Sequence, residues 1–185
     1  MVLKLFRSTG YSSILMAGET RQPMHPGWMI LAISLWAGFL CNVALWRGFA
    51  GNGQAGGPVH AVLLAAFITG LSATLLSVFG WRKTLKPVAT LVLLAAALTA
   101  CTTWSEAAPF DGTLLDRGIF NMLLPSWASL FRWQTWAALA GLAVLPSVWV
   151  WNTGVRRLDG EHQLRVNIKG ALSGAALLVT SGWLL

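Results

Sequence analysis

The sequence of 185 residues contains few charged side chains and very few acidic ones. Asp, Glu, Lys and Arg make up 10% of the residues, against roughly 25% in a water-soluble domain. Hydrophobic residues make up 56%, and glycine-rich phosphate loops and base-stacking modules are absent. The composition excludes an ordinary soluble enzyme and predicts an integral membrane protein. The net charge of +7 favours a negatively charged membrane surface as its counterpart, and we expect no nucleic-acid partner.

Cysteine is also scarce, because the chain has only Cys41 and Cys101. Both lie inside apolar runs, so neither a disulfide framework nor a paired zinc motif is expected. We interpret them as small buried side chains. The N-terminal residues 1–26 hold only a short apolar patch at 14–17, which is too brief for a secretory signal. These residues are therefore predicted to form a cytoplasmic tail.

Five apolar stretches are long enough to cross about 30 Å of hydrocarbon. Each must be helical in lipid, because an unpaired backbone amide there costs several kcal/mol. The sequence therefore predicts an all-α, five-helix membrane domain over residues 27–185, with crossings at 28–46, 59–79, 87–104, 133–151 and 168–185. Their connections are interpreted as a glycine-rich turn at 51–58, a basic loop at 81–86, a longer mixed connection, and a charged hairpin at 152–167.

The distribution of Lys and Arg predicts the orientation of these crossings. Ten of them lie in the N-terminal tail and in the second and fourth connections, whereas three lie in the first and third. The positive-inside rule then predicts a cytoplasmic N-terminus and a periplasmic C-terminus, in a multi-pass protein of the bacterial inner membrane. Most of the eleven Trp residues fall near the predicted boundaries, where they are expected to anchor the helices.

The third connection is apolar enough at 113–124 to lie on the outer membrane surface as a short helix. Pro125 would end or kink it. Asp111 and Asp116 in this connection are five residues apart, which does not place them on one helical face. They are therefore a weak candidate for a pair of acid and base.

Other side chains that could carry chemistry are few. The topology separates His25, His60 and His162, so we expect no metal site, no cofactor and no catalytic residue. Charge within the crossings is limited to Lys169 at one edge, which disfavours a transporter. Asn42 can hydrogen-bond between helices, and the GxxxG pair of Gly170 and Gly174 permits close helix packing.

Several motifs together resemble a known family. They are the Cys41-Asn42 pair, the run Arg-Lys-Thr-Leu-Lys-Pro at 82–87, the run Asp-Arg-Gly-Ile-Phe-Asn at 116–121, Val-Leu-Pro at 144–146 and the Arg156-Arg157 pair. With five crossings and an inside N-terminus, they resemble the N-terminal membrane domain of bacterial phosphoethanolamine transferases that modify lipid A. The resemblance covers roughly residues 28–185.

The resemblance implies both a site and a missing part. In that family a periplasmic domain with zinc and a threonine nucleophile follows the fifth crossing; this sequence ends at Leu185, so we expect no catalytic domain. The family's outer loop runs from an Asn to a Thr about four residues on and a Glu about eight on, near the donor lipid. Counting from Asn121, those places hold Pro125 and Ser129. Shifting by one residue gives Ser126 and Leu130, so the acidic residue is lost in both registers.

Two functions follow as hypotheses. In the first, the chain is a non-catalytic accessory or structural subunit of a larger inner-membrane complex, of respiratory or photosynthetic type, derived from the transferase membrane domain. In the second, it is the membrane domain of a truncated or split lipid A phosphoethanolamine transferase. Under either hypothesis its partners are membrane lipids, with possible headgroup contacts at Asp116, Arg117 and Asn121, and under the first also other transmembrane subunits.

Overall fold

The computed structural model describes residues 23–43, 45–46, 57–106 and 133–185, without the side chains of 57, 82 and 103–106. Within these residues the chain is helical, as predicted. The helical segments are α1 (Pro26–Leu35), the π-helical η2 (Trp36–Leu40), α3 (Gly57–Val78), α4 (Arg82–Glu106), α7 (Trp133–Leu139), the π-helical η4 (Ala140–Val144), α8 (Leu145–Asn152) and α9 (Gly160–Leu184).

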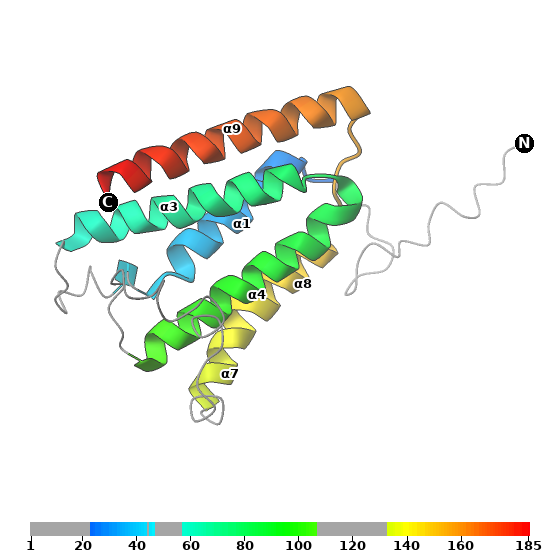
Figure 1. Cartoon of the computed structure of the whole chain (residues 1–185). Coiled ribbons are helices and arrows are strands. Elements are labelled where there is room, and N and C mark those ends of the chain that lie inside the picture. Colours follow the sequence, from blue (N-terminus) through cyan, green and yellow to red (C-terminus); the bar gives the residue numbers. More distant parts are fainter. Residues whose placement is uncertain (1–22, 44, 47–56, 107–132) are drawn as a thin grey trace, which may run out of the picture.

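These segments form five rods that alternate in direction along the chain (Figure 1). The first rod is α1 with η2, and the fourth is α7, η4 and α8 in succession. α1 packs between α3 and α4, and α4 packs along the fourth rod. α9 lies along α3 and makes nearly all of its contacts there. The starts of α1, α4 and α9 therefore meet the ends of α3 and α8 at one end of the bundle.

Two helices begin earlier than the apolar stretches that predicted them. Residues 160–167, interpreted as part of a charged hairpin, form the first two turns of α9 instead. Glu161 in the first turn is favoured by the positive end of the helix dipole, and it pairs with Arg165 at 2.5 Å. Residues 82–86, interpreted as a loop, likewise form the first turn of α4, where fully buried Leu85 ties the helix to the core.

The main core lies between the first rod, α3, α4 and α8. Its buried members include Met29 and Ile33 of α1, Leu76 of α3, Leu93 of α4 and Val150 of α8. Core contacts thus join four of the five rods.

A side-chain hydrogen bond joins the two π-helical segments. Trp36 of η2 donates from Nε1 to the carbonyl oxygen of Leu142 in η4, at 3.1 Å. The first and fourth rods are therefore held in register by a polar contact as well as by packing.

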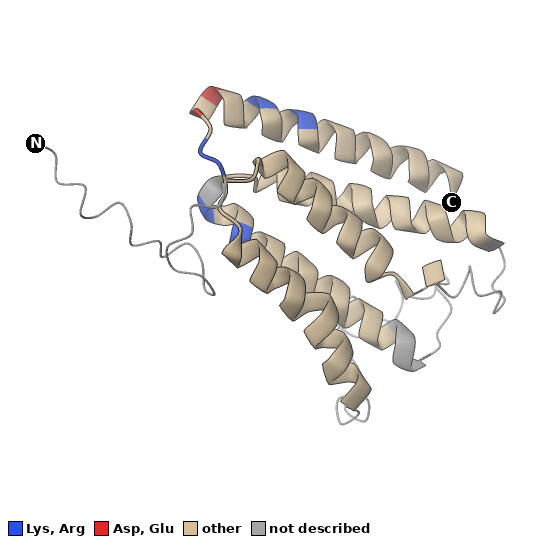
Figure 2. Cartoon of the chain, turned by 180° about the vertical axis from the view of Figure 1, so that it is seen from behind, with Lys and Arg blue, Asp and Glu red and all other residues tan. Residues whose placement is uncertain are grey.

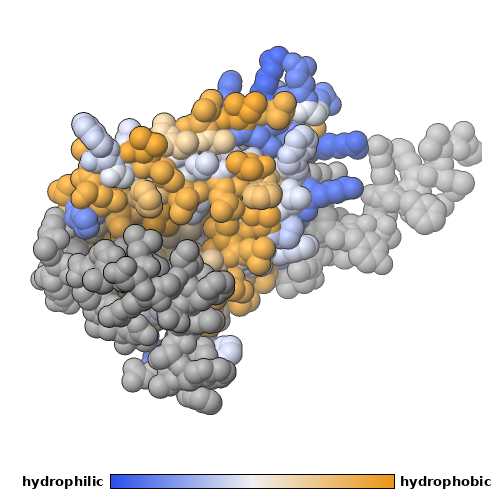
Figure 3. All heavy atoms as spheres, viewed as in Figure 1, coloured by the Kyte–Doolittle hydropathy of each residue, from blue (hydrophilic) through white to orange (hydrophobic). Residues whose placement is uncertain are grey.

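The burial pattern of α9 is the reverse of that in a soluble protein. Its buried residues are polar or small, namely Gln163, Asn167, Gly174 and Ser181. Its exposed large residues are apolar, namely Leu164, Ile168, Leu172, Leu177, Val179, Trp183 and Leu184. Large apolar side chains are also exposed on the other rods, and Figure 3 shows them covering much of one face, with the most hydrophilic side chains mainly at the end where α9 starts.

Two helices are long and apolar enough to cross a membrane, Pro58–Val78 and Lys83–Thr102. The apolar helix Pro26–Leu40 is shorter, and α9 does not meet the combined requirement of length and hydropathy. Length and hydropathy alone therefore support two crossings among the described residues.

Candidate functional site

The side chains predicted to contact a lipid headgroup, Asp116, Arg117 and Asn121, lie outside the described residues. The predicted interfacial helix at 113–124 and nearly all of the predicted cytoplasmic tail do so as well. The candidate site is therefore built from the charged end of the bundle and from the surface between α3 and α9.

Charged residues gather at one end of the bundle in the described part of the chain (Figure 2). Six are basic and two are acidic; they are Lys83, Lys86, Arg156, Arg157, Arg165, Lys169, Asp159 and Glu161. They come from the start of α4, the linker between α8 and α9, and the start of α9. Because the rods alternate in direction, these separate segments meet and produce a strongly positive end.

The linker between α8 and α9 is fixed to the start of the first rod. Met24 donates its backbone N–H to the carbonyl oxygen of Gly154 at 2.8 Å, and Arg156 donates its backbone N–H to Met24 at 2.9 Å. These bonds form a parallel β-bridge between Met24 and Val155, and Val155 is buried in the main core. Arg156 and Arg157 are exposed, so their side chains start from a backbone that is held in place.

Lys86 and Trp151 join α4 to α8 at the same end. Lys86 donates from Nζ to the carbonyl oxygen of Trp151 at 3.0 Å, and Nζ lies 5.9 Å from the centroid of the Trp151 ring. That distance is within the range of a cation–π interaction, worth about 0.5–1 kcal/mol at an exposed site. Trp151 in turn donates from Nε1 to Thr90 Oγ1 at 3.1 Å. The aromatic ring at this corner is therefore held by both helices.

Sequence reasoning missed a buried polar cluster where α9 meets the turn between α3 and α4. Gln163 donates from Nε2 to the carbonyl oxygen of Gly80 at 2.7 Å and to Asn167 Oδ1 at 2.9 Å. A Cβ on Gly80 would lie 2.5 Å from Asn167 Oδ1 and 3.0 Å from the carbonyl oxygen of Ser77, so a larger residue would displace the Asn167 side chain. The available signal was the helical spacing of Gln163 and Asn167 with Gly170 and Gly174, which places amides and glycines on one face of α9.

The two predicted packing glycines, Gly170 and Gly174, both lie against α3. A Cβ on Gly174 would be 2.7 Å from Thr74 Oγ1, 2.8 Å from Thr74 N and 3.0 Å from the carbonyl oxygen of Gly70. A Cβ on Gly170 would be 2.5 Å from Ser77 Oγ. The two backbones therefore approach more closely than any larger residue would permit, the arrangement that small residues give in membrane helices.

Asn42, the third predicted packing residue, is buried but acts locally. Its Oδ1 accepts a hydrogen bond from the backbone N–H of Leu45 at 3.3 Å, in the bend that follows η2. Its Nδ2 has no hydrogen-bond partner among the described residues. The observed bond therefore stabilises a turn in the first rod and does not join two helices.

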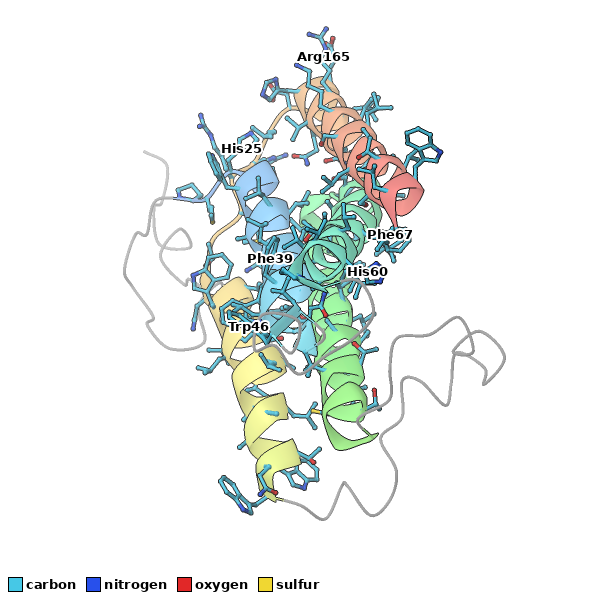
Figure 4. All side chains as sticks on the ribbon, turned by 90° about the vertical axis from the view of Figure 1, so that its left-hand side faces the viewer. His25, Phe39, Trp46, His60, Phe67 and Arg165 are labelled. Carbon is cyan, nitrogen blue, oxygen red and sulfur yellow. The ribbon has the colours of Figure 1, made fainter. Side chains whose placement is uncertain are left out.

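The three histidines lie apart. His25 precedes α1, where its Nδ1 accepts a hydrogen bond from the backbone N–H of Gly27 at 3.1 Å. His60 is near the start of α3, at the other end of the bundle, and His162 is exposed near the start of α9; Figure 4 labels His25 and His60 at separate places. Across the described residues, no three His, Cys, Asp or Glu side chains are close enough to hold a metal ion together. What these residues offer chemically is positive charge, hydrogen bonding and close packing.

The apolar exterior, the reversed burial of α9 and the gathering of the described charges at one end are typical of a helical membrane protein. Residues 68–185 match the family model described as phosphoethanolamine transferase EptA/EptB. The chain belongs to this family, through the N-terminal membrane domain of these transferases, and the predicted resemblance is confirmed. The match begins within α3 and runs through α9, so it includes Gly70 and Thr74 of the α3–α9 surface and the charged residues at the end of the bundle. The search of curated proteins and the search of solved structures each found no match.

Proposed function

We propose that the chain crosses the bacterial inner membrane five times, with the charged end in the cytoplasm and the C-terminus in the periplasm. The positive-inside rule supports this orientation, because six basic side chains meet two acidic ones at that end. The lengths agree as well: the 22 residues of α3 span about 33 Å at 1.5 Å per residue, enough for about 30 Å of hydrocarbon. The 25 residues of α9 span about 37 Å, so its charged first turns would extend into the headgroup region.

The reversed burial of α9 is the observation that carries this proposal. Gln163 and Asn167 are 7% and 6% exposed, whereas Ile168 is 49% exposed. In water this arrangement would be unfavourable, because it exposes a long apolar stripe and buries polar side chains. In lipid the same arrangement is favourable, because the amides bond to protein and the apolar stripe faces acyl chains.

A cysteine-labelling experiment tests the orientation. Native Cys41 and Cys101 are buried, so they are first replaced by Ala, and single cysteines are then introduced as Arg157→Cys at the charged end or Trp183→Cys near the other end. In cells with a permeabilised outer membrane, we expect a membrane-impermeant maleimide to label position 183 at once. Position 157 should react only after the inner membrane is opened. The reverse pattern would contradict the orientation.

We infer further that the chain is a non-catalytic structural subunit of a larger inner-membrane assembly, of respiratory or photosynthetic type. Two observations support this role. The outer loop carries Pro125 and Ser129 where the resemblance implies Thr and Glu, which removes the acidic group near a donor headgroup. The rods expose apolar side chains beyond those that their own core uses, and such surfaces suit packing against other membrane helices or lipid.

The second candidate is the membrane domain of a lipid A phosphoethanolamine transferase whose catalytic domain is supplied separately or lies further along a longer chain. The family match over residues 68–185 favours it. In this case the bundle would anchor the catalytic domain beside its lipid substrates, and the departures in the outer loop would weaken donor binding.

One pair of measurements separates the two candidates. The tagged chain is purified from its native membrane in a mild detergent, and co-purifying proteins are identified on a native gel by mass spectrometry. Lipid A from a deletion strain and a complemented strain is analysed for phosphoethanolamine in parallel. A defined complex with unchanged lipid A supports the structural subunit. Loss of phosphoethanolamine on deletion, restored by the chain, would establish the transferase role instead.

A further inference from the structure

The basic side chains beside the fixed linker form a surface that neither candidate function uses. We propose that this surface, formed by Lys83, Arg156 and Arg157 and here named the basic linker site, binds the headgroups of anionic phospholipids. The inference rests on the proposed membrane embedding, but not on which side of the membrane the charged end faces.

The first argument is the fixed position of these charges. The two backbone bonds of Met24, with Gly154 and Arg156, flank buried Val155 and hold the linker up to the backbone N–H of Arg156. Lys83 lies on the first turn of α4, three residues before Lys86, which is itself bonded to Trp151. Figure 2 shows the basic part of the linker next to the start of α4. A surface fixed in this way loses less conformational entropy on binding than a mobile basic tail.

The second argument is the excess of positive over negative charge beside the linker. Glu161 already pairs with Arg165 at 2.5 Å. Asp159 is the other acidic residue described at this end, and among the described residues no ion pair joins Lys83, Arg156 or Arg157 to an acidic side chain. Exposed basic side chains at a membrane surface attract anionic headgroups, with a gain in affinity of about fivefold for each Lys or Arg.

The third argument is the depth at which these charges lie. The partly exposed rings of Trp81, Trp149 and Trp151 are at the same end of the bundle, and tryptophan prefers the level of the lipid headgroups. An acidic protein would find positive charge here, but a phospholipid matches both the charge and the headgroup level that these tryptophans indicate.

Native mass spectrometry of the purified full chain in a mild detergent provides the test. Dioleoyl phosphatidylglycerol is titrated as the anionic lipid and dioleoyl phosphatidylcholine as the neutral one. The variant Arg156→Gln with Arg157→Gln is compared with a control that removes the same charge nearby, Arg165→Gln with Lys169→Gln. We expect the linker variant to bind phosphatidylglycerol about 30-fold more weakly than the wild type and the control to lose less than about threefold.

Two further measurements keep the test decisive if the linker variant does not fold. Arg156→Lys with Arg157→Lys retains the charge and should retain binding. For the wild type, phosphatidylglycerol affinity should fall as salt rises from about 0.05 M to about 0.5 M, because exposed charges are screened, whereas phosphatidylcholine binding should change little.

Three results would overturn the proposal. Equal binding of the two lipids by the wild type would show that there is no preference for anionic headgroups. Equal losses of affinity in the linker and control variants would show that binding depends on net charge and not on the basic linker site. An acidic protein released by the linker variant, with lipid binding unchanged, would identify a protein partner instead. Failure of the membrane proposal is distinguishable from all three, because the chain would then stay folded in buffer without detergent.

Discussion

Replacing Gly174 by Ala tests the closest contact in the bundle with the smallest possible change. The added Cβ would lie 2.7–3.0 Å from Thr74 and Gly70, where ordinary van der Waals contact begins near 3.4 Å. Two of the three nearest atoms belong to the backbone of α3, so no side-chain rotation can relieve the overlap. α9 must therefore move away from α3 by several tenths of an ångström along the whole shared surface.

The expected cost follows from overpacking. Forcing one extra methyl group into a closely packed site typically costs about 1–3 kcal/mol, which changes the unfolding equilibrium by about 5- to 150-fold. Gly141 provides a matched control, because it also lies inside a helical segment but has no atom within 4 Å of its Cβ position. Gly141→Ala should change stability by no more than about 1 kcal/mol, since only backbone propensity is affected.

The assay is equilibrium unfolding of the purified chain in mixed micelles of mild detergent and dodecyl sulfate, followed by circular dichroism. Gly70→Ala should cost about as much as Gly174→Ala, because its Cβ would meet Leu178 N and Gly174 O at 2.7 and 2.8 Å. The double variant should cost less than the sum, because separating the helices once relieves both overlaps. Equal stability of Gly174→Ala and Gly141→Ala would refute the reasoning.

Two further variants probe other contacts. Gln163→Leu removes the bond to the buried carbonyl of Gly80 and should destabilise the protein by about 1–3 kcal/mol. Its control, Gln134→Leu on exposed α7, should change stability by about 0.5 kcal/mol or less. Unfolding in the same mixed micelles compares the two variants, and equal effects would contradict a structural role for the buried polar cluster. Gly38→Ala should separate the first rod from α3, because its Cβ would lie 2.7 Å from the carbonyl oxygen of Ala65. Its thermal midpoint, measured by size-exclusion survival after heating, should fall below that of Gly141→Ala, and an unchanged midpoint would show that the rods can adjust.

Hydropathy predicted the helical class but misplaced two helix starts. It detects where side chains suit hydrocarbon, and a helix can continue beyond that region when its polar residues find partners. Residues 160–167 are too polar to count as a crossing, yet Gln163 bonds to the α3–α4 turn and Glu161 to Arg165. Residues 82–86 become helical because Leu85 is buried at the base of α4. The Glu161–Arg165 spacing is a local helical signal that a hydropathy scan does not read, whereas the contact of Gln163 with Gly80 joins residues far apart in the sequence.

The candidate site could be predicted only in part. Counting Lys and Arg was enough to place the basic segments together, because alternating helices bring every second connection to the same end. The fixed linker was not predictable, since its backbone bonds join Met24 to Gly154 and Arg156 across most of the sequence. The GxxxG spacing identified Gly170 and Gly174 as small residues, but which helix they face depends on Gly70 and Thr74 of α3.

The buried face of α9 has a consequence for biogenesis. With amides and glycines along one side, α9 is a weak substrate for insertion by the translocon on its own, whereas α3 is apolar enough to enter unaided. We expect α9 to leave the translocon efficiently only when α3 is already present to receive it. A glycosylation-acceptor reporter fused after Leu185 should record this as a drop in insertion when α3 is replaced by an unrelated apolar helix. Stable entry of α9 into the membrane would then depend on a helix that precedes it in the chain.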